Sequence, residues 1–334
     1  MQGGDDYALG VDIGGTNTKI GLVNRAGEVS ALRRFRTEAH GSDPGPFLGR
    51  LFEHTQAVLS AASGNVIGIG IATHGYTDEA RDGPVVCGNT PALAGVKLRG
   101  LLSAHFGLPA VLNNDLIAHA LAESHFGSGR DVRRFMCVAM GTGLGAGFIV
   151  DGAPLRIFGG TTGDPGRVIL EPGGPPDAYG VRGSAEALCG VPAIERLAEG
   201  RYGRAVRAHE VIASAREGEP IAAEVMAQIG ARLGHLVAIL SVLFVPQRVA
   251  ITGGTAEAGP VLLQACRARF EELVGDYHRT VASGSSAQAA AIKPLDAGEI
   301  VLGQMRGETG VVGAVVELLQ RRAGEATDQL PSIT

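Results

Sequence analysis

The residues whose side chains are best suited to bind a ligand form a polar run between two apolar segments near the N-terminus. The run is Asp12-Ile13-Gly14-Gly15-Thr16-Asn17-Thr18-Lys19, with Leu9 and Val11 before it and Ile20 to Val23 after it. The apolar residues alternate as strands do, which predicts a hairpin with the glycines at its tip. Glycine permits close approach of a ligand, and free N–H groups beside an ammonium favour phosphate oxygens. A plain hairpin turn that binds nothing is the other interpretation.

Two common phosphate-binding motifs do not match this run. A Walker A loop ends in Gly-Lys-Ser/Thr and opens a helix. Here Lys19 is followed by Ile20 and a predicted strand. The Rossmann fingerprint also opens a helix, so it is excluded on the same ground.

A second hairpin of the same kind follows later in the chain. Strand-like residues 135–140 lead into Gly141-Thr142-Gly143-Leu144-Gly145-Ala146-Gly147, and Phe148-Ile149-Val150 resume a strand. This repeat suggests two related halves, each with a phosphate hairpin. A third glycine turn, Gly253-Gly254-Thr255, precedes a predicted helix near Val261, whose N-terminus could meet an anion or a nucleotide.

An acidic residue lies between the two hairpins. The short strand Ala110-Val111-Leu112 leads to Asn113-Asn114-Asp115, and a helix is predicted from Leu116 to Phe126. Strands and helices alternate throughout this half, which predicts an α/β fold with ligands at the carboxyl ends of its strands. Asp115 therefore lies at a strand end where a ligand is expected.

Composition excludes several classes of protein. A length of 334 residues suggests two domains, and a net charge of −5 with a pI near 6.0 argues against nucleic-acid binding. The four cysteines are scattered without a Cys-x-x-Cys pair, as in reduced cytoplasmic proteins. The longest apolar run, 236–245, is shorter than a membrane span, and residues 1–6 lack a signal pattern. We expect a cytoplasmic protein without membrane partners.

Together, these motifs resemble the ROK family of sugar kinases and sugar-responsive repressors, over about residues 8 to 320. The run from Asp12 to Lys19 looks like the family's first phosphate motif, the run from Gly141 to Gly147 like the second, and Thr252-Gly253-Gly254 like its adenosine-side turn. Asn114-Asp115 matches the pair that carries the catalytic base.

The resemblance implies an actin-like ATPase fold, a duplicated ribonuclease-H-like architecture of two domains with a central cleft. We expect a small domain at 1–125, joined by a C-terminal helix near 308–322, and a large domain at 126–307. It also implies ATP and Mg²⁺ as cofactors, Mg²⁺ being held through Asp12, and a homodimer. The repressors carry an added helix-turn-helix region, for which there is no room before Tyr7, and this argues against DNA binding.

The nucleotide and the acceptor are expected to bind separate groups of residues. The nucleotide residues are Asp12, Gly14, Gly15, Thr16, Asn17, Lys19, Gly141, Thr142, Gly143, Gly253 and Gly254. The segment from Gly88 to Gly95 is similar to the N-acetylglucosamine kinase and glucokinase branch. The acceptor residues, beside the base Asp115, are Gly75, Asn89, Asn114, Asp164, Arg167 and Glu186.

Each of these roles has a structural alternative. Asp12 could be a strand-end acid that bonds the turn, and Lys19 could lie in water at a strand end. Asp115 could cap the following helix and Asn114 could form a turn. Glu186 could stabilise the first turn of a helix through its dipole.

The chain departs from its relatives where they bind structural zinc. Their Gly-Glu-x-Gly-His becomes Gly163-Asp164-Pro165-Gly166-Arg167, and the three cysteine positions of the following knuckle become Asp177, Tyr179 and Ser184. Arginine does not bind zinc, so no zinc site is expected. Arg167 either reads an altered substrate end or pairs with Asp164 or Asp177 as a structural clamp.

The sequence therefore predicts an ATP-dependent kinase that phosphorylates a hydroxyl group of a hexose or a hexose-like polyol. The primary hydroxyl is the expected target. A C7-cyclitol kinase is the specific alternative, since a cyclitol lacks the anomeric hydroxyl that the usual Glu and His read. A non-catalytic sugar sensor is the alternative of another class, against which the intact Asp115 and both phosphate turns argue.

Overall fold

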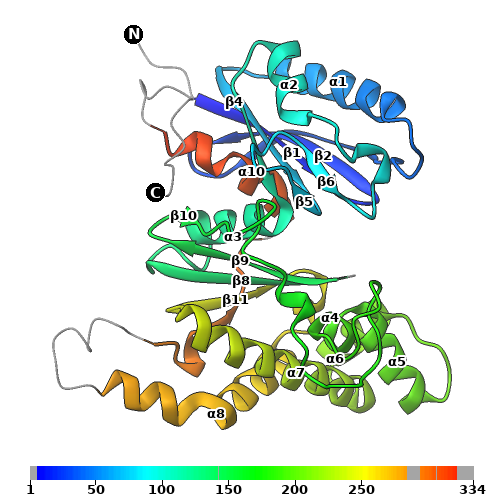
Figure 1. Cartoon of the computed structure of the whole chain (residues 1–334), viewed down its shortest axis with the longest axis vertical. Coiled ribbons are helices and arrows are strands. Elements are labelled where there is room, and N and C mark those ends of the chain that lie inside the picture. The colour runs from blue at the N-terminus through cyan, green and yellow to red at the C-terminus, as the bar shows by residue number, and fades with distance from the viewer. Residues whose placement is uncertain (1–5, 142, 284–293, 306, 322–334) are drawn as a thin grey trace. The chain divides into compact units, whose positions relative to one another are not determined.

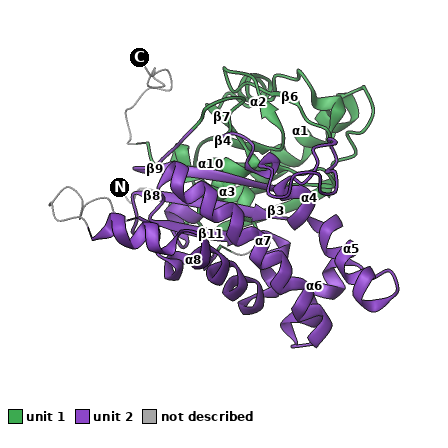
Figure 2. Ribbon diagram, turned by 60° about the horizontal axis from the view of Figure 1, so that its bottom comes forward, with its two compact units in different colours: residues 1–122, 156–161, 305–334 green, residues 123–155, 162–304 purple. Residues whose placement is uncertain are grey.

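The computed structural model describes residues 6–141, 143–283, 294–305 and 307–321. The chain divides into two compact units (Figure 2): unit 1 comprises 1–122, 156–161 and 305–334, and unit 2 comprises 123–155 and 162–304. The domain bounds expected from the sequence stay a prediction. Thr142, a strand expected at 289–292 and a frayed tail expected after 325 lie outside the described residues.

Unit 1 is built on a five-stranded sheet of order β3-β2-β1-β4-β7. Strands β1 (Asp6–Ile13), β2 (Asn17–Asn24) and β3 (Val29–Arg36) are antiparallel, while β4 (Asn65–Thr73) and β7 (Ala110–Asn114) run parallel to β1. The predicted hairpin is thus β1–β2, with Asp12 opposite Lys19. The two-stranded β5 (Tyr76–Thr77) and β6 (Pro84–Val86) follow β4.

The helices of unit 1 are α1 (Gly45–Leu59), α2 (Leu98–Phe106), most of α3 (Asp115–Phe126) and α10 (Thr309–Leu319), with the 3₁₀ turn η1 (Pro91–Leu93). Helix α10 packs on β1 and β4 because glycine leaves room for its backbone. A Cβ on Gly10 would lie 2.2 Å from the carbonyl oxygen of Val311, and one on Gly70 would lie 2.1 Å from that of Ala314. This packing brings the start of α10 to the end of β1.

Unit 2 repeats the sheet of unit 1. Its order is β10-β9-β8-β11-β12, with β8 (Arg134–Met140), β9 (Leu144–Val150) and β10 (Ala153–Pro154) antiparallel and β11 (Arg248–Thr252) and β12 (Ile300–Leu302) parallel to β8. The hairpin β8–β9 occupies the place of β1–β2. The repeat inferred from the glycine turns is therefore a repeat of topology.

The core of unit 2 is packed by α4 (Ala185–Cys189), α5 (Val191–Tyr202), α6 (Ala208–Arg216), α7 (Pro220–Phe244) and α8 (Pro260–Ala282). Short 3₁₀ helices are η2 (Pro165–Arg167), η3 (Gly254–Ala258) and η4 (Ala297–Glu299). Helix α7 begins after Glu219, whose carboxylate accepts from the N–H groups of Ile221 and Ala222.

Helix α7 is also long and apolar enough to cross a membrane by length and composition. Half of its most apolar window is buried within the protein, and it lies beside α8 along its length (Figure 1). Apolar residues along its middle, such as Ile229, Leu233 and Val237, are fully buried in the core of unit 2. The burial identifies α7 as a core helix.

Candidate active site

The β1–β2 hairpin tip is held by hydrogen bonds within unit 1. The N–H of Gly14 donates to the carbonyl of Asn17 at 3.1 Å, and the Thr37 hydroxyl donates to the carbonyl of Gly14 at 2.7 Å. Gly15 lies against Asn89, since a Cβ on Gly15 would lie 2.9 Å from the Cβ of Asn89. A residue expected to contact phosphate and a residue expected to contact the acceptor are thus neighbours.

Asp12 lies at the end of β1 against the first turn of α10. A Cβ on Gly310 would lie 2.5 Å from Cγ of Asp12, so only glycine fits there. Burial raises the pKa of the Asp12 carboxyl; His119 and Lys19 lower the pKa, whereas Asp115 raises it. Asp12 and Asp115 therefore lie within electrostatic reach of each other.

Lys19 forms an ion pair with an acidic residue that is distant in the sequence. Its Nζ lies 2.8 Å from Oε2 of Glu308, which precedes α10. Arg34 lies 3.6 Å from the other carboxylate oxygen of Glu308. The sequence left Lys19 as either a phosphate ligand or a residue in water, and the structure adds a third possibility, an ion pair that joins β2 to the start of α10.

Asn114 and Asp115 lie where β7 ends and α3 begins. The Asn114 amide donates to the carbonyl of Gly75 at 2.8 Å, which brings together two residues expected near the acceptor. The N–H of Leu116 donates to Oδ1 of Asn114 and to Oδ1 of Asp115, both at 2.9 Å. Both side chains thus bond the first turn of α3, which leaves Oδ2 of Asp115 outside these bonds.

In unit 2, the β8–β9 turn lies beside the start of two other elements. The N–H of Gly141 donates to the carbonyl of Gly143 at 2.9 Å, and the N–H of Val191 donates to the carbonyl of Gly141 at 3.1 Å. Gly253 has a φ of 84°, and a Cβ there would lie 2.2 Å from the carbonyl of Met140. Glycine is therefore required at Gly253, and the predicted nucleotide residues Gly141 and Gly253 lie close together.

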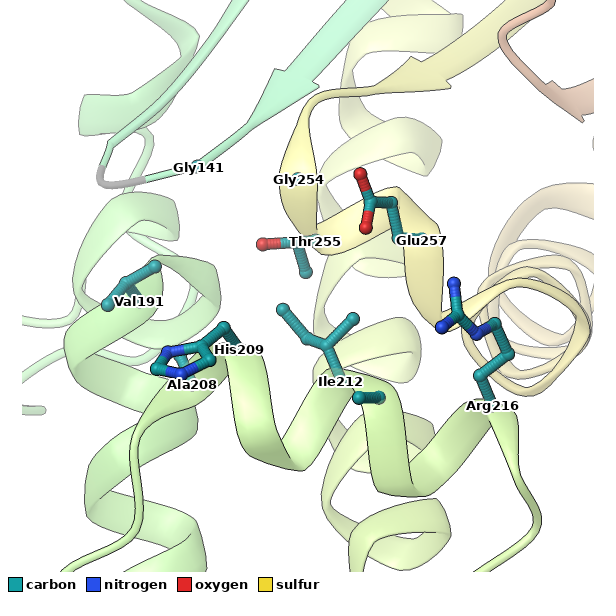
Figure 3. Close-up of a pocket in the computed structure, with 10 residues that line it drawn as sticks. Gly141, Val191, Ala208, His209, Ile212, Arg216, Gly254, Thr255 and Glu257 are labelled. Atoms are coloured by element: carbon teal, nitrogen blue, oxygen red, sulfur yellow. The ribbon is translucent and has the colours of Figure 1, made fainter.

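A pocket of about 220 Å³ lies beside these glycine turns (Figure 3). Its lining comes from the β8–β9 turn, η3, α6 and the start of α5, and consists of Gly141, Val191, Ala208, His209, Ile212, Ala213, Arg216, Gly254, Thr255 and Glu257. Figure 3 shows Ile212 and Thr255 facing each other, with Glu257 and Arg216 at one end. Apart from Gly141, Gly254 and Thr255, these residues were not predicted from the sequence, because no local pattern marks α6 as a pocket wall.

Arg167 lies at the centre of an ion cluster in unit 2. Its Nη1 lies 2.7 Å from Glu186 Oε1 and 3.1 Å from Asp177 Oδ2, and its Nε lies 3.5 Å from Asp164 Oδ2. The guanidinium also stacks 4.5 Å from the centre of the Tyr179 ring. Three predicted acceptor residues, Asp164, Arg167 and Glu186, are thus brought together.

The Arg167 cluster joins Asp177, Tyr179 and Ser184, the three positions that the resemblance predicted to correspond to zinc-binding cysteines. The Ser184 hydroxyl donates to Oδ2 of Asp177 at 2.7 Å, and the N–H groups of Tyr179 and Val181 donate to its Oδ1. Although burial opposes ionisation, these donors and Arg167 hold the pKa of Asp177 below its usual range. In the described part of the chain, no three His, Cys, Asp or Glu side chains gather as metal ligands.

Glu186 has both carboxylate oxygens engaged. Oε1 pairs with Arg167, and Oε2 accepts from the N–H of Leu144 at 3.1 Å. A Cβ on Gly143 would lie 2.6 Å from Oε2, so glycine is needed for this contact. Glu186 therefore links the Arg167 cluster to the β8–β9 turn.

Comparison with known proteins identifies relatives over nearly the whole chain. The ROK family profile matches residues 8–315. A glucokinase of Streptomyces coelicolor is 26% identical, covering 92% of this chain and 95% of its own, and a kanosamine kinase of Amycolatopsis mediterranei is 29% identical over 81% and 88%. The crystal structure of a ROK family glucokinase from Streptomyces griseus, in complex with glucose and AMPPNP, has a TM-score of 0.73 at 24% identity, covering 93% and 98%. The duplicated sheets of both units thus belong to the actin-like ATPase fold, as expected.

Proposed function

This chain belongs to the ROK family and is a phosphotransferase of the sugar-kinase kind, and we propose that it transfers the γ-phosphate of ATP to a hydroxyl group of a hexose or a hexose-like polyol. We expect the primary hydroxyl to be the acceptor. The observation that carries the proposal is the placement of two carboxyl groups at the ends of parallel strands of one sheet, with Asp12 on β1 beside the glycine hairpin and Asp115 directly after β7. Phosphoryl transfer depends mainly on such positioning and on charge stabilisation.

Asp115 is the proposed general base. Its carboxylate accepts the proton of the acceptor hydroxyl as that oxygen bonds to the γ-phosphorus, and the bond between the γ-phosphorus and ADP breaks. The bond from the N–H of Leu116 to Oδ1 holds the carboxylate at the start of α3. Asn114, held by its bond to Gly75, orients a neighbouring hydroxyl.

The two glycine hairpins are the proposed phosphate-binding elements. The N–H groups of Gly14 and Gly141 bond within their own turns, so the other N–H groups of the two tips would hold the β- and γ-phosphates, with the hydroxyls of Thr16 and Thr142 assisting. The pocket of about 220 Å³ beside Gly254 is smaller than the roughly 300 Å³ or more of a complete ligand site, which suits the base of the nucleotide.

Mg²⁺ is the metal that this proposal requires, and the residues fit it. Mg²⁺ is usually held by one or two carboxylates, phosphate oxygens and water, so it needs no dedicated protein cage. Burial raises the pKa of Asp12, which means that it disfavours the ionised carboxylate. A cation bound nearby would stabilise the ionised form. When bound, Mg²⁺ neutralises charge on the transferring phosphate.

The acceptor residues of unit 2 support a second candidate, a C7-cyclitol kinase. In the ROK motif, the Glu and His at the positions of Asp164 and Arg167 read hydroxyls near the anomeric carbon. Here Arg167 pairs with Asp164 and Glu186, and a guanidinium offers only donors. A substrate without an anomeric hydroxyl would suit this arrangement. In unit 1, Gly75, Asn89 and Asn114 remain the proposed acceptor residues under either candidate.

Oligomeric state and location are proposed from the family likeness alone. We propose a homodimer that acts in the cytoplasm on a small-molecule sugar or cyclitol. Light scattering of the purified protein tests the first point, since a mass near 34.2 kDa would indicate a monomer.

A coupled ADP-release screen tests the proposed function. The panel should contain glucose, kanosamine, N-acetylhexosamines, fructose and C7-cyclitols, each with ATP and Mg²⁺. Turnover with one hexose or cyclitol at more than background ATP hydrolysis is the expected result. No turnover with any polyol, together with saturable sugar binding by calorimetry, would instead indicate a sensor.

A further inference from the structure

A buried charge network lies in unit 1, outside the residues assigned above. Glu317 on α10 lies 3.3 Å from Nη1 of Arg81 and 3.0 Å from Nη2 of Arg156. All three meet the side chain of Asn113, which is completely buried. The Asn113 amide donates to Glu317 at 2.7 Å, and its oxygen accepts from Arg156 at 2.6 Å and from Arg81 at 3.2 Å.

The network holds the strand end from which the proposed base projects. Asn113 precedes Asn114 and Asp115, and side chains of a strand alternate between its two faces. Asn113 is fixed on one face by three charged groups, while Asn114 is fixed by the carbonyl of Gly75. The backbone that carries Asp115 is therefore clamped at two consecutive residues.

Arg156 reaches this network from an unusual part of the chain. Residues 156–161 belong to unit 1, whereas the residues on both sides of them belong to unit 2. The segment is attached to unit 1 by the bond from the N–H of Thr77 to the carbonyl of Gly159 at 2.8 Å. The two residues that flank the segment are bonded to each other, because the Thr162 hydroxyl donates to the carbonyl of Leu155 at 2.9 Å. Arg156 is thus the charged residue through which segment 156–161 bonds Asn113 at the end of β7.

The network is more buried and more highly connected than an ion pair on the protein surface. The side chains of Arg81, Arg156 and Glu317 are 12%, 21% and 19% exposed. Two guanidinium groups share one carboxylate and one amide oxygen, so each bond depends on the others. Loss of one partner would leave a buried group without its hydrogen bonds, which costs more than a surface pair contributes.

We propose that Arg156 and Glu317 are positioning residues for phosphoryl transfer, because through Asn113 they fix the end of β7 in the orientation that Asp115 needs. This inference rests on the proposed function, since it assumes Asp115 as the base. Both residues bond Asn113 and each other, and they act on Asp115 only through the strand end. Their removal should therefore lower kcat without weakening nucleotide binding, because a small displacement of a catalytic group is costly.

The experiment compares Arg156→Met, Arg156→Lys, Glu317→Gln and the double variant with the wild-type chain. Arg133→Met is the matched control, because Arg133 pairs with Asp151 on the surface, where the two side chains are 78% and 53% exposed. Steady-state kinetics with the best acceptor gives kcat and both KM values, and urea unfolding gives stability. Hydrogen exchange of the Leu116 amide reports the order of the strand end without any need for activity.

We expect Arg156→Met and Glu317→Gln to lower kcat at least about tenfold, with KM for ATP within about twofold. Arg156→Lys should recover part of the loss, and the double variant should be less impaired than the product of the two single effects. The Leu116 amide should exchange at least about tenfold faster in both single variants, and Arg133→Met should match the wild type.

Two outcomes overturn different claims. Variants that are less stable but keep wild-type kcat and Leu116 protection would make the network a structural ion cluster and refute the positioning role. A wild-type chain with no turnover on any acceptor would refute the proposed function instead. In that case hydrogen exchange alone still decides whether Arg156 and Glu317 hold the strand end.

Discussion

The Nη1 atom of Arg167 lies 2.7 Å from Oε1 of Glu186. Glu186 keeps the spacing of the motif that the sequence resembles, and Arg167 stands at the position that the resemblance predicted to correspond to a zinc-binding His. With Asp177 as its second acidic partner, Arg167 joins η2 to the loop of Asp177 and to the start of α4. It thereby engages Glu186, which the sequence predicts to contact the acceptor.

Replacement of Arg167 by Met should destabilise the protein. Asp177 and Glu186 would lose their shared cation, and Asp177 is almost fully buried, so we expect a loss of about 1–3 kcal/mol of unfolding free energy. Urea unfolding measures it. Arg133→Met, at an exposed pair, should leave the free energy of unfolding nearly unchanged. Equal losses in the two variants would argue against the clamp.

The same cluster makes the stability of the folded protein depend on pH in the acidic range. The pKa of Asp177 in the folded protein lies below the value of 3.8 expected of an unperturbed Asp, because the Ser184, Val181 and Tyr179 donors and Arg167 outweigh burial. Its stabilising contribution is therefore complete above the unfolded pKa and is lost as pH falls through the folded pKa. Melting temperature should fall more steeply below about pH 4 in the wild type than in Asp177→Asn. Parallel curves would contradict this assignment.

Structural zinc should be dispensable for this chain. Arg167, Asp177, Tyr179 and Ser184 bond one another at the positions of the zinc ligands, and none offers a thiolate or an imidazole. Metal analysis of protein purified without added metals should find well below one zinc per chain, and a zinc chelator should leave the melting temperature unchanged. One zinc per chain, lost together with stability on chelation, would show the substitution argument to be wrong.

The pocket walled by α6 should be specific for the nucleotide. Ile212→Trp would fill the cavity from the wall that faces Thr255, as Figure 3 shows. KM for ATP should rise at least about tenfold, equivalent to about 1.4 kcal/mol, while KM for the acceptor should change little. Leu243→Trp is a suitable control, since Leu243 at the end of α7 is already 66% exposed. A rise confined to the acceptor KM would place the sugar in this pocket instead.

The hairpins and the strand before Asp115 could be predicted because their signals are local. A glycine turn between alternating apolar runs defines both strands and their register, and the structure confirms this for β1–β2 and β8–β9. The helix predicted near Val261 is confirmed as well, since α8 begins at Pro260. The 3₁₀ helix η3, which lies between the third glycine turn and α8, was not predicted.

Long-range contacts explain what the sequence did not reveal. Lys19 pairs with Glu308, Asn113 bonds Arg156 and Glu317, and Gly10 lies under α10, all through residues far apart in the chain. Helix α5 was missed after a loop-rich stretch, and its role as a pocket wall depends on tertiary packing alone. Such contacts leave no periodic pattern in the sequence.

Asp115 is the central claim, and Asp115→Asn tests it most directly. The amide keeps the size of the side chain and its acceptor for the N–H of Leu116 but cannot take up the proton of a hydroxyl. ATP-dependent phosphorylation of the best acceptor should fall by about a hundredfold to ten-thousandfold, with an unchanged melting temperature and with Asp151→Asn fully active. A folded Asp115→Asn protein that keeps wild-type kcat and KM would contradict the assignment of the base.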